Sequence, residues 1–508
     1  MDPSASQTGA PPAPEPAGRP PPGRPQHQPY LAVWARADGR LVIGALAGGV
    51  FFDIAARSGL ATVAATAWVS VTAAAIYMGG RVRGRTSLLF ISAVPVLGLI
   101  LTLRSSPWVI VPVTLAVALL LFLGVSLGAD GSALTTTFPA LGTRLALVAG
   151  HLVLAPAMFR PAGKPAPGEA AGKRAVAVAV ARGALLAVPV MITVGLLLAV
   201  ADPIFRSWFD LTPAIQHLTL ALIGAWAVAG LSRAASAREP SPRLPSCPAL
   251  GTVEAALVLG GLCALYAAFV AAQFVALAGG GRHVLVTQGL TYAQYARSGF
   301  FQLLACAVIT LLVLLGVRAC ASPDRPVLMA LSGLTAALTI GVVIVAIRRL
   351  QLYEAAFGLT MLRLACLVAA VWIGIVFVLL GATIHRRGLP RRWFPAAVVV
   401  SGLMAVGIWG ASNPASIVAQ TNLRRAGHGH SFDVGQAASL GPDAVPALVA
   451  GLRYLGAAQA TELRHAICAQ PAGEDAGAAF NLSRARANEA LARACGQLRP
   501  GPATRTAP

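Results

Sequence analysis

The stretch Gly299–Val317, GFFQLLACAVITLLVLLGV, contains no charged residue, and Trp108–Leu127, WVIVPVTLAVALLLFLGVSL, is a second uncharged run. An α-helix rises about 1.5 Å per residue, so roughly 20 such residues cross a hydrocarbon core about 30 Å thick. Runs of this kind recur from Leu41 to Gly410. The chain is 56% hydrophobic and 11% charged, with a mean hydropathy of +0.72. The sequence therefore predicts an all-α, polytopic helical membrane protein.

Eleven apolar runs are long enough to be predicted as spans. They are residues 41–57, 60–80, 86–103, 108–127, 177–200, 214–232, 252–278, 299–317, 326–347, 364–384 and 393–410. The first two are separated only by Ser58 and Gly59, so we expect them to form a tight helical hairpin.

The segment 141–159, LGTRLALVAGHLVLAPAMF, is a twelfth candidate, but it contains Arg144, His151 and Pro156. If it does not cross, the main arginine clusters share the side of the N-terminus, as the positive-inside rule requires; if it crosses, the later clusters change sides. We therefore expect an interfacial or re-entrant segment, with eleven spans, and twelve is the alternative. The clusters are Arg81/Arg83/Arg85, Arg160/Lys164/Lys173/Arg174, Arg233/Arg238/Arg243, Arg318/Arg325 and Arg386/Arg387/Arg391/Arg392.

This topology predicts three regions. Residues 1–40 form a disordered, Pro-rich cytoplasmic tail and juxtamembrane segment, since they offer few apolar side chains to bury. Residues 41–410 form the transmembrane helical bundle. Residues 411–508, where the apolar periodicity stops, form a small helical C-terminal domain outside the cytoplasmic membrane. Cys468 and Cys495 are the only cysteines in that polar region, and an oxidising compartment makes them candidates for a disulfide.

The net charge is +21, and nearly all of the basic residues are arginines. In a soluble protein this charge would indicate nucleic acid binding. Here the arginines lie in short loops between apolar runs, where they set topology, so we expect a bilayer and no nucleic acid as the partner. The richness in arginine and alanine indicates a GC-rich bacterial genome, and hence a multi-pass protein of the bacterial cytoplasmic membrane.

Charges on the outer face are more informative, because they oppose the insertion bias. Three outer segments carry them, residues 201–212, 281–299 and 348–363, and Arg104 lies in a shorter outer turn. The segments converge on a polar pocket for an anionic or lipid-linked ligand, or they form an interfacial belt of aromatic and basic residues, or they make ion pairs between helices. The candidate ligand-binding residues are Asp202, Arg206, Asp210, Tyr292, Tyr295, Arg297, Arg348, Tyr353, Glu354 and Arg363.

Asp53, in GGVFFDIAAR, is the most conspicuous acid inside an apolar run. An unpaired carboxylate costs several kcal/mol in hydrocarbon, so Asp53 is a functional candidate. It precedes Arg57 by four residues, and a helical ion pair between them is the structural alternative. His428 and His430 lack further residues at ligand spacing, and no phosphate-binding glycine motif is present. We therefore expect no metal, no cofactor and no catalytic residue.

Several separated motifs agree with one known family. They are GLTYAQYARSGFF (289–301), LYEAAFGLTMLR (352–363), NPASIVAQTNLRR (413–425) and FNLSRARA (480–487). With these motifs the chain resembles the bacterial polytopic membrane family described as domain of unknown function 4153/4173. The resemblance implies the architecture, without an activity. It also implies that Asn413 and Asn422 belong to family motifs.

The residues favour transport or ligand sensing at the cell envelope through an outward-facing polar pocket. One alternative is a membrane enzyme acting on lipid-linked envelope precursors, although the first outer loop, Ser58-Gly59, is too short to supply the acidic residues of such enzymes. The other alternative is a non-catalytic membrane scaffold. The absence of a catalytic motif favours a protein that is not an enzyme.

Overall fold

The computed structural model describes residues 39–127 except 80, 81 and 83, residues 138–155 except 154, and residues 213–236, 250–275, 299–321, 325–385, 393–470 and 476–496, with a few positions between 183 and 195. In this part of the chain every regular element is a helix, and the only β-type pairing is a single bridge between Leu250 and Ala321. The predicted tail, except for its last two residues, and most of the predicted span 177–200 lie outside the described residues.

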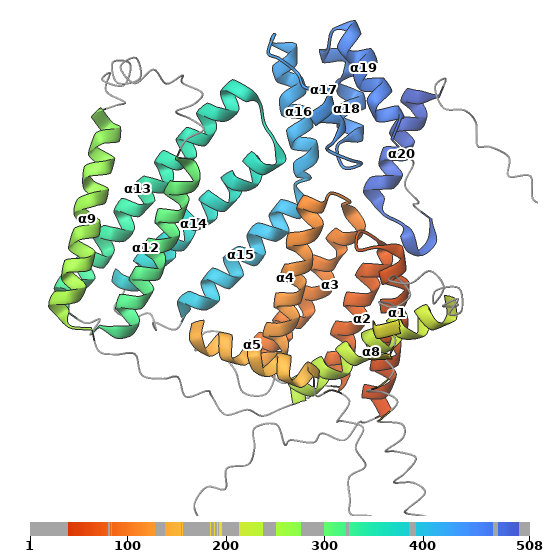
Figure 1. Cartoon of the computed structure of the whole chain (residues 1–508), viewed down its shortest axis with the longest axis horizontal. Helices are drawn as coiled ribbons and strands as arrows, with labels where there is room; N and C mark the ends of the chain where they lie inside the picture. Colours follow the sequence, from red (N-terminus) through yellow and green to blue (C-terminus); the bar gives the residue numbers. More distant parts are fainter. Residues whose placement is uncertain are drawn as a thin grey trace, which may run out of the picture. The chain divides into compact units, whose positions relative to one another are not determined.

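Helices of the first half pack in sequence-adjacent pairs, and α8 lies against α1 (Figure 1). Their bounds are α1 Gly39–Ser58, α2 Val63–Gly79, α3 Arg85–Leu103, α4 Pro107–Ser126, α5 Phe138–Val153 and α8 Pro213–Ser236. The α1–α2 connection is the tight hairpin predicted from Ser58 and Gly59. Gly59 adopts φ +92°, and its carbonyl accepts a hydrogen bond from the Thr62 hydroxyl.

Three further helices, α9, α12 and α14, pack around α13, and α15 lies between α14 and helices α3 and α4 of the first half. The bounds are α9 Thr252–Val275, α12 Phe300–Cys320, α13 Pro326–Phe357, α14 Met361–His385 and α15 Trp393–Ala411. Side-chain hydrogen bonds join α9 to its neighbours. The Tyr266 hydroxyl lies 2.6 Å from Thr310 Oγ1 of α12, and Cys263 Sγ lies 3.1 Å from Thr335 Oγ1 of α13.

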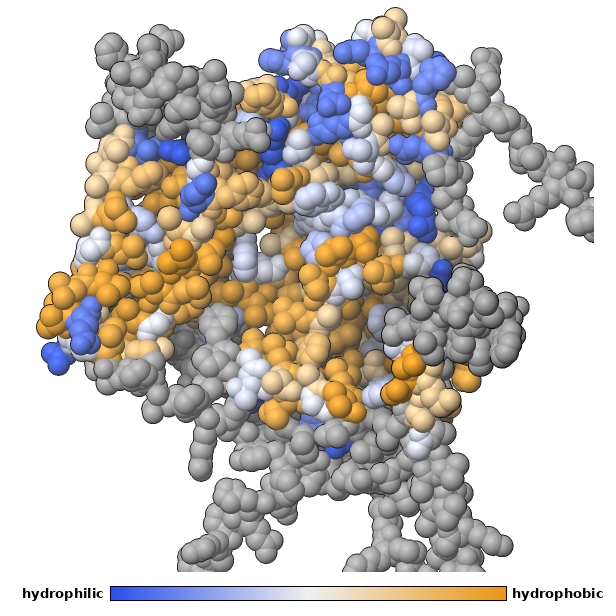
Figure 2. Space-filling view, in the orientation of Figure 1, coloured by the Kyte–Doolittle hydropathy of each residue, from blue (hydrophilic) through white to orange (hydrophobic). Residues whose placement is uncertain are grey.

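Short helices follow α15 and contact one another (Figure 1). We call α16 to α20 the C-terminal helices. Their bounds are α16 Pro414–Gly427, α17 Val434–Ala438, α18 Val445–Gly451, the 3-10 turn Leu452–Tyr454, α19 Ala457–Cys468, the 3-10 turn Gly477–Ala479 and α20 Leu482–Cys495. In Figure 2 hydrophilic residues gather over these helices, whereas hydrophobic residues dominate the surface of the long helices.

Nine helices of the described residues are long and apolar enough to span a membrane: α1, α3, α4, α8, α9, α12, α13, α14 and α15. This result confirms a helical, membrane-type architecture. The helix α2, in the predicted span 60–80, is apolar but has only 17 residues. Large apolar side chains remain exposed on these helices, for example Val96 at 68% and Leu257 at 71%, as expected for helices that face lipid.

The segment 141–159 contains a short apolar helix rather than one of the nine candidates. The guanidinium of Arg144 donates a 2.7 Å hydrogen bond to the carbonyl of Ser126, the last residue of α4. At the other end of α5, the carbonyl of Leu152 accepts a 2.7 Å hydrogen bond from the Trp226 indole of α8. A helix of 16 residues is about 24 Å long, so α5 is shorter than the hydrocarbon core. Its interfacial placement stays a prediction.

The helix α13 is longer than its predicted span. Its apolar part, Val327–Ile347, ends before Arg348. The helix continues to Phe357 because residues 348–357 contain no glycine or proline. Gly358 adopts φ +81°, which favours glycine and ends the helix. The last ten residues of α13 therefore carry most of the polar residues of the third predicted segment, and Arg363 follows in α14.

Small residues let α1 and α8 approach closely. A Cβ atom on Gly224 would lie 2.4 Å from the Phe52 Cβ atom and 3.0 Å from the Gly49 Cα atom, and a Cβ atom on Gly49 would lie 2.3 Å from the Ala221 carbonyl oxygen. Such contacts drive helix association in membranes, where the hydrophobic effect between helices is absent. The glycines are therefore required by the packing.

We expect Gly224→Val to separate α1 from α8 and to destabilise the protein by about 1–3 kcal/mol, because the added side chain has no space. The measurement is thermal unfolding of the purified protein in detergent. Gly261→Val in α9 is the matched control, since a Cβ atom there meets no atom within 4 Å. Equal unfolding temperatures for the two variants would contradict the close packing.

Candidate functional site

Of the three predicted outer segments, the structure describes the whole of the third and only Gly299 of the other two. Asp202, Arg206 and Asp210 of the first segment, and Tyr292, Tyr295 and Arg297 of the second, lie outside the described residues. Residues 348–363, which we call the corner, comprise the last turns of α13, the turn 358–360 and the first residues of α14. Arg348, Tyr353, Glu354 and Arg363 all belong to it. Convergence of the three segments stays a prediction.

Arg363 organises the corner from the start of α14. Its guanidinium carbon lies 4.0 Å from the centre of the Tyr353 ring, a cation–π contact between α14 and α13. The same guanidinium donates a hydrogen bond to the carbonyl of Gly358 in the turn. Tyr353 also packs edge-on against Phe357, with ring centres 5.1 Å apart. Arg363 therefore connects the last turns of α13 to the corner's turn.

Two polar side chains of the corner are incompletely satisfied. The Oε1 atom of Glu354 is buried and has no hydrogen-bond partner within the described part of the chain. Arg348 is exposed, and its guanidinium makes one long hydrogen bond, 3.4 Å, to the neutral Gln351 Oε1 atom. A buried acceptor without a partner costs about 1–3 kcal/mol. The corner therefore has unused capacity to accept a hydrogen bond and to bind an anion.

The C-terminal helices form hydrogen bonds with the corner, mainly with its turn. The Asn422 side chain of α16 accepts a hydrogen bond from the Leu359 N–H and donates one to the Leu359 carbonyl, both at 2.8 Å. Gln436 of α17 donates to the same carbonyl at 3.1 Å, and Arg425 donates to the Ala355 carbonyl at 2.9 Å. We call these contacts the corner clamp. They satisfy backbone groups that the end of α13 leaves without helical partners.

A second clamp holds the turn between α3 and α4. Asp443, which is 2% exposed, accepts hydrogen bonds from the Ser105 N–H, the Ser105 hydroxyl and the Ser106 N–H at 2.9–3.2 Å. Its own carbonyl accepts a 3.0 Å hydrogen bond from the Asn413 side chain, which also caps α16. The Asp443 carboxylate thus supplies acceptors to N–H groups at the start of α4, where negative charge is favoured.

Arg104 and Asn481 complete this second clamp. The Arg104 guanidinium donates to the carbonyls of Gly410 and Ala411 at the end of α15, at 2.9 and 2.6 Å. Burial lowers the pKa of Arg104 from its usual value, and the nearby Asp443 carboxylate offsets part of this shift. Asn481, which is fully buried, donates to the carbonyls of Leu101 and Arg104 at 3.1 and 2.8 Å. Arg104, predicted from the sequence to lie in a short outer turn, therefore contacts the end of α15, and Asn481 contacts the end of α3.

Asp53 forms the predicted ion pair and one contact that the sequence did not indicate. Arg57 donates to both carboxylate oxygens, at 3.1 and 2.9 Å. In addition, the Nδ1 atom of His217 in α8 lies 2.9 Å from Asp53 Oδ2. Asp53 is 8% exposed, and this group joins the C-terminal end of α1 to the N-terminal end of α8.

Cys468 and Cys495 form a disulfide between the ends of α19 and α20, with Cα atoms 5.9 Å apart. This pair matches the disulfide candidates of the sequence. No cluster of three or more metal-ligating side chains occurs among the residues that the structure describes. His428 binds the carbonyl of Arg424 within α16 and its cap.

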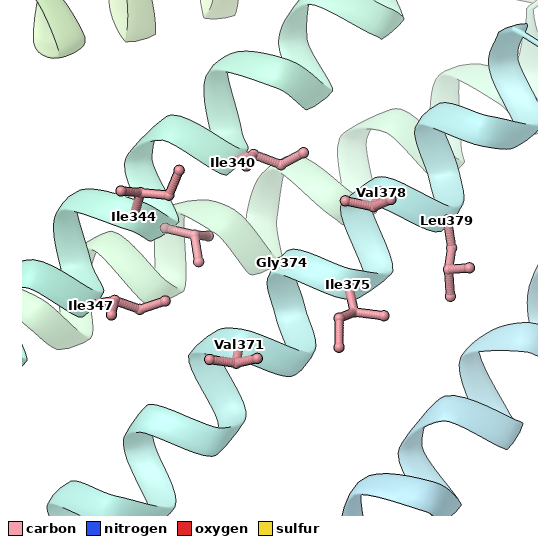
Figure 3. A pocket seen from close by; sticks show the side chains of 9 residues that line it. Ile340, Ile344, Ile347, Val371, Gly374, Ile375, Val378 and Leu379 are labelled. Carbon is pink, nitrogen blue, oxygen red and sulfur yellow. The ribbon is translucent and has the colours of Figure 1, made fainter.

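An apolar groove runs between α13 and α14 (Figure 3), and its lining residue Ile347 directly precedes the corner in the sequence. Its volume is about 330 Å³, and every lining side chain is aliphatic or absent. Several of these side chains are exposed, including Ile344 at 54% and Val378 at 59%. The groove is lined by Ile340, Val343, Ile344, Ile347, Val371, Gly374, Ile375, Val378 and Leu379.

Sequence reasoning missed Asp443 and Asn481 because each is a single polar residue in a short turn. A weak local signal exists for both. Asn481 precedes helix-forming residues, and its side chain accepts from the N–H groups of Ser483 and Arg484 as an N-cap. Asp443 follows Gly441-Pro442 and precedes α18. The local pattern predicts a cap, whereas the contacts with the α3–α4 turn arise from the tertiary fold.

We expect Asp443→Ala to loosen the C-terminal helices. The substitution leaves the buried N–H group of Ser106 and the N–H group of Ser105 without an acceptor, at a cost of about 1–3 kcal/mol each. Limited proteolysis of residues 414–495 measures the effect as faster cleavage. Asp433→Ala is the control, because Asp433 accepts only from the exposed Gln436 N–H in its own turn. Cleavage at the rate of the unmodified protein would contradict the proposed clamp.

We expect Asp53→Asn and His217→Gln to be coupled. Removing the charge of Asp53 weakens its bond to His217, so the double variant should be more stable than the sum of the single losses predicts. The coupling free energy should be about 0.5–1.5 kcal/mol, because the His217 side chain is 41% exposed. Thermal or denaturant unfolding in detergent measures it. Strict additivity of the two substitutions would show that the contact between Asp53 and His217 contributes nothing to the free energy of unfolding.

Comparison with known proteins identifies one family. Residues 86–451 match the family whose description is "Domain of unknown function (DUF4153)". The match covers more than half of the chain, which therefore belongs to this family. No curated protein and no solved structure matches the chain.

Proposed function

We propose that this member of the DUF4153 family is a ligand-sensing protein of the bacterial cell envelope, in which the corner binds an anionic ligand and the C-terminal helices respond. The observation that carries the proposal is that adjacent residues of one turn contact both parts. Arg363 binds the carbonyl of Gly358, and Asn422 binds both backbone groups of Leu359. A ligand that moves Arg363 or Glu354 therefore acts on a peptide that α16 holds directly.

The turn itself is built to transmit such a movement. Gly358 has a positive φ, and a Cβ atom there would lie 3.0 Å from Asn422 Oδ1. This close approach makes the Asn422 contact sensitive to the backbone position of the turn. The ligand can act on α16 in this way only if the protein has two conformations whose populations the ligand shifts. The hydrogen bonds of the corner clamp would differ between these two conformations.

Sensing is favoured over transport because the contacts of the corner lead into the C-terminal helices. The position of Glu354 supports ligand binding, since its buried Oε1 atom can accept a hydrogen bond without losing another partner within the described residues. A buried polar atom without a partner calls for an explanation, and we propose a bound ligand group as the explanation for Glu354.

The proposed orientation places the corner and the C-terminal helices outside the cytoplasm. The α3–α4 turn and the α13–α14 turn both contact the C-terminal helices, so they share one side. Arg85, Arg318 and Arg325 lie at the opposite ends of α3, α12 and α13. The positive-inside rule assigns that end to the cytoplasm. The disulfide between Cys468 and Cys495 fits an oxidising compartment on the other side.

The test is hydrogen exchange of the full-length protein in phosphatidylcholine nanodiscs with and without phosphatidylglycerol as the anionic probe. We expect phosphatidylglycerol to change exchange in α16 and in the turn 358–360. In Asn422→Ala the α16 amides should exchange roughly tenfold faster, because two hydrogen bonds are lost, and they should no longer respond to the lipid.

Gln420→Ala is the matched control on the same helix, since Gln420 is exposed and its amide donates to Ser416 within α16. This variant should keep the response of the unmodified protein. Exchange in α16 that is the same with and without the anionic lipid would overturn the sensing role.

A further inference from the structure

The groove between α13 and α14 has apolar walls and a polar end. On α13 the lining residues Ile340, Val343 and Ile347 form one stripe along the helix, at spacings of three and four. The same stripe continues to Gln351 and Glu354, which lie four and seven residues beyond Ile347. Arg348 reaches this stripe with its side chain, since its guanidinium contacts Gln351. The polar groups therefore follow the apolar groove along one face.

The depth of this polar end matches a membrane interface. The apolar part of α13, Val327–Ile347, has 21 residues and a length of about 31 Å, close to the thickness of the hydrocarbon core. Arg348 therefore lies near the boundary of that core. A charged side chain at this depth requires an opposite charge or a route to water. Within the described residues Arg348 forms no ion pair, and its one hydrogen bond is to the neutral Gln351.

We propose that the groove binds one acyl chain of an anionic phospholipid from the surrounding bilayer, with its phosphate at Arg348 and a headgroup hydroxyl at Glu354. The arginine supplies charge complementarity to the phosphate. The buried Oε1 atom of Glu354 accepts the hydrogen bond that a hydroxyl donates. Glu354 is six residues beyond Arg348, about 9 Å along the helix, so both groups of a phosphoglycerol headgroup can be met.

The walls suit a single flexible chain. The lining side chains in Figure 3 are Ile, Val and Leu, with no nitrogen or oxygen among them. Gly374 leaves the floor open, because a Cβ atom there would lie 3.8 Å from Val343 Cγ1, at ordinary contact distance. Burying each methylene group of a chain in such a site contributes about 0.8 kcal/mol relative to water, although lipid competes for it inside a bilayer. The arginine and the carboxylate then select the headgroup.

This inference rests on the proposed function and names the class of ligand for the corner. The test uses phosphatidylglycerol with a photoreactive diazirine on one acyl chain, incorporated into phosphatidylcholine nanodiscs that contain the full-length protein. Cross-linked peptides are identified by mass spectrometry. We expect labelling of residues 340–347 and 371–379, and weaker labelling by a phosphatidylcholine probe with the same diazirine chain.

Two variants separate the groove from its polar end. Gly374→Leu fills the floor and should lower groove labelling roughly tenfold, the loss expected if about two methylene contacts disappear. Gly381→Leu, on the same helix, is the control, since a Cβ atom at Gly381 meets no atom within 4 Å. Arg348→Gln should lower the preference for phosphatidylglycerol about fivefold while labelling by the phosphatidylcholine probe persists.

Equal labelling by the two probes, or unchanged labelling in Gly374→Leu, would overturn the lipid site. Arg348→Gln keeps the test decisive if Gly374→Leu does not fold, because unchanged lipid preference in that variant has the same meaning. The two proposals fail separately. Groove labelling without a response of α16 would remove sensing alone, whereas a response of α16 without groove labelling would remove the lipid groove alone.

Discussion

The structure depends on hydrogen bonds between polar side chains in or next to the C-terminal helices and the turns of the long helices. A helix satisfies its own backbone along its length, but its ends leave N–H and carbonyl groups that need partners. Asp443 meets the first N–H groups of α4, Asn481 meets the last carbonyls of α3, and Asn422 meets both groups of Leu359. These three side chains tie the ends of three long helices to one set of short ones.

The long helices associate by a different mechanism. Between helices that face lipid, close packing and a few polar contacts replace the hydrophobic effect. Gly49 and Gly224 let α1 and α8 approach, and Asp53 with His217 adds an electrostatic contact between the same pair. Between α9 and its neighbours the contacts include neutral polar pairs, such as Tyr266 with Thr310. The α13–α14 pair leaves an open apolar groove, which is the site proposed for a lipid acyl chain.

The corner combines these two kinds of contact. The end of α13 in the corner is the polar end of the proposed lipid groove, and the turn 358–360 is held by Asn422 of α16. Arg363 lies between the two parts, stacked on Tyr353 and bonded to Gly358. The corner clamp consists of a few hydrogen bonds to backbone groups. A small displacement of the turn 358–360 would therefore change a large share of these hydrogen bonds, which is why a sensing role is physically reasonable.

The sequence by itself determined the class of fold, most of the spans and the composition of the corner. Uncharged runs of about 20 residues predict membrane helices without knowledge of their neighbours, because the hydrocarbon core sets their length. Arg348, Tyr353, Glu354 and Arg363 could be named as candidates because they lie between two apolar runs, and their role stays a prediction. The extension of α13 to Phe357 was not, since the predicted span stopped at the end of its apolar run.

Only the tertiary structure decided which helix ends the polar residues hold. Asp443 binds the Ser105–Ser106 turn across 338 and 337 residues of sequence, and Asn481 binds Leu101 across 380. Likewise, His217 meets Asp53 over 164 residues. Local patterns report propensity and periodicity within a few turns, so they contain no information about partners at such separations. A buried polar side chain finds its partner only when packing brings the two helix ends together, and that packing is a property of the whole fold.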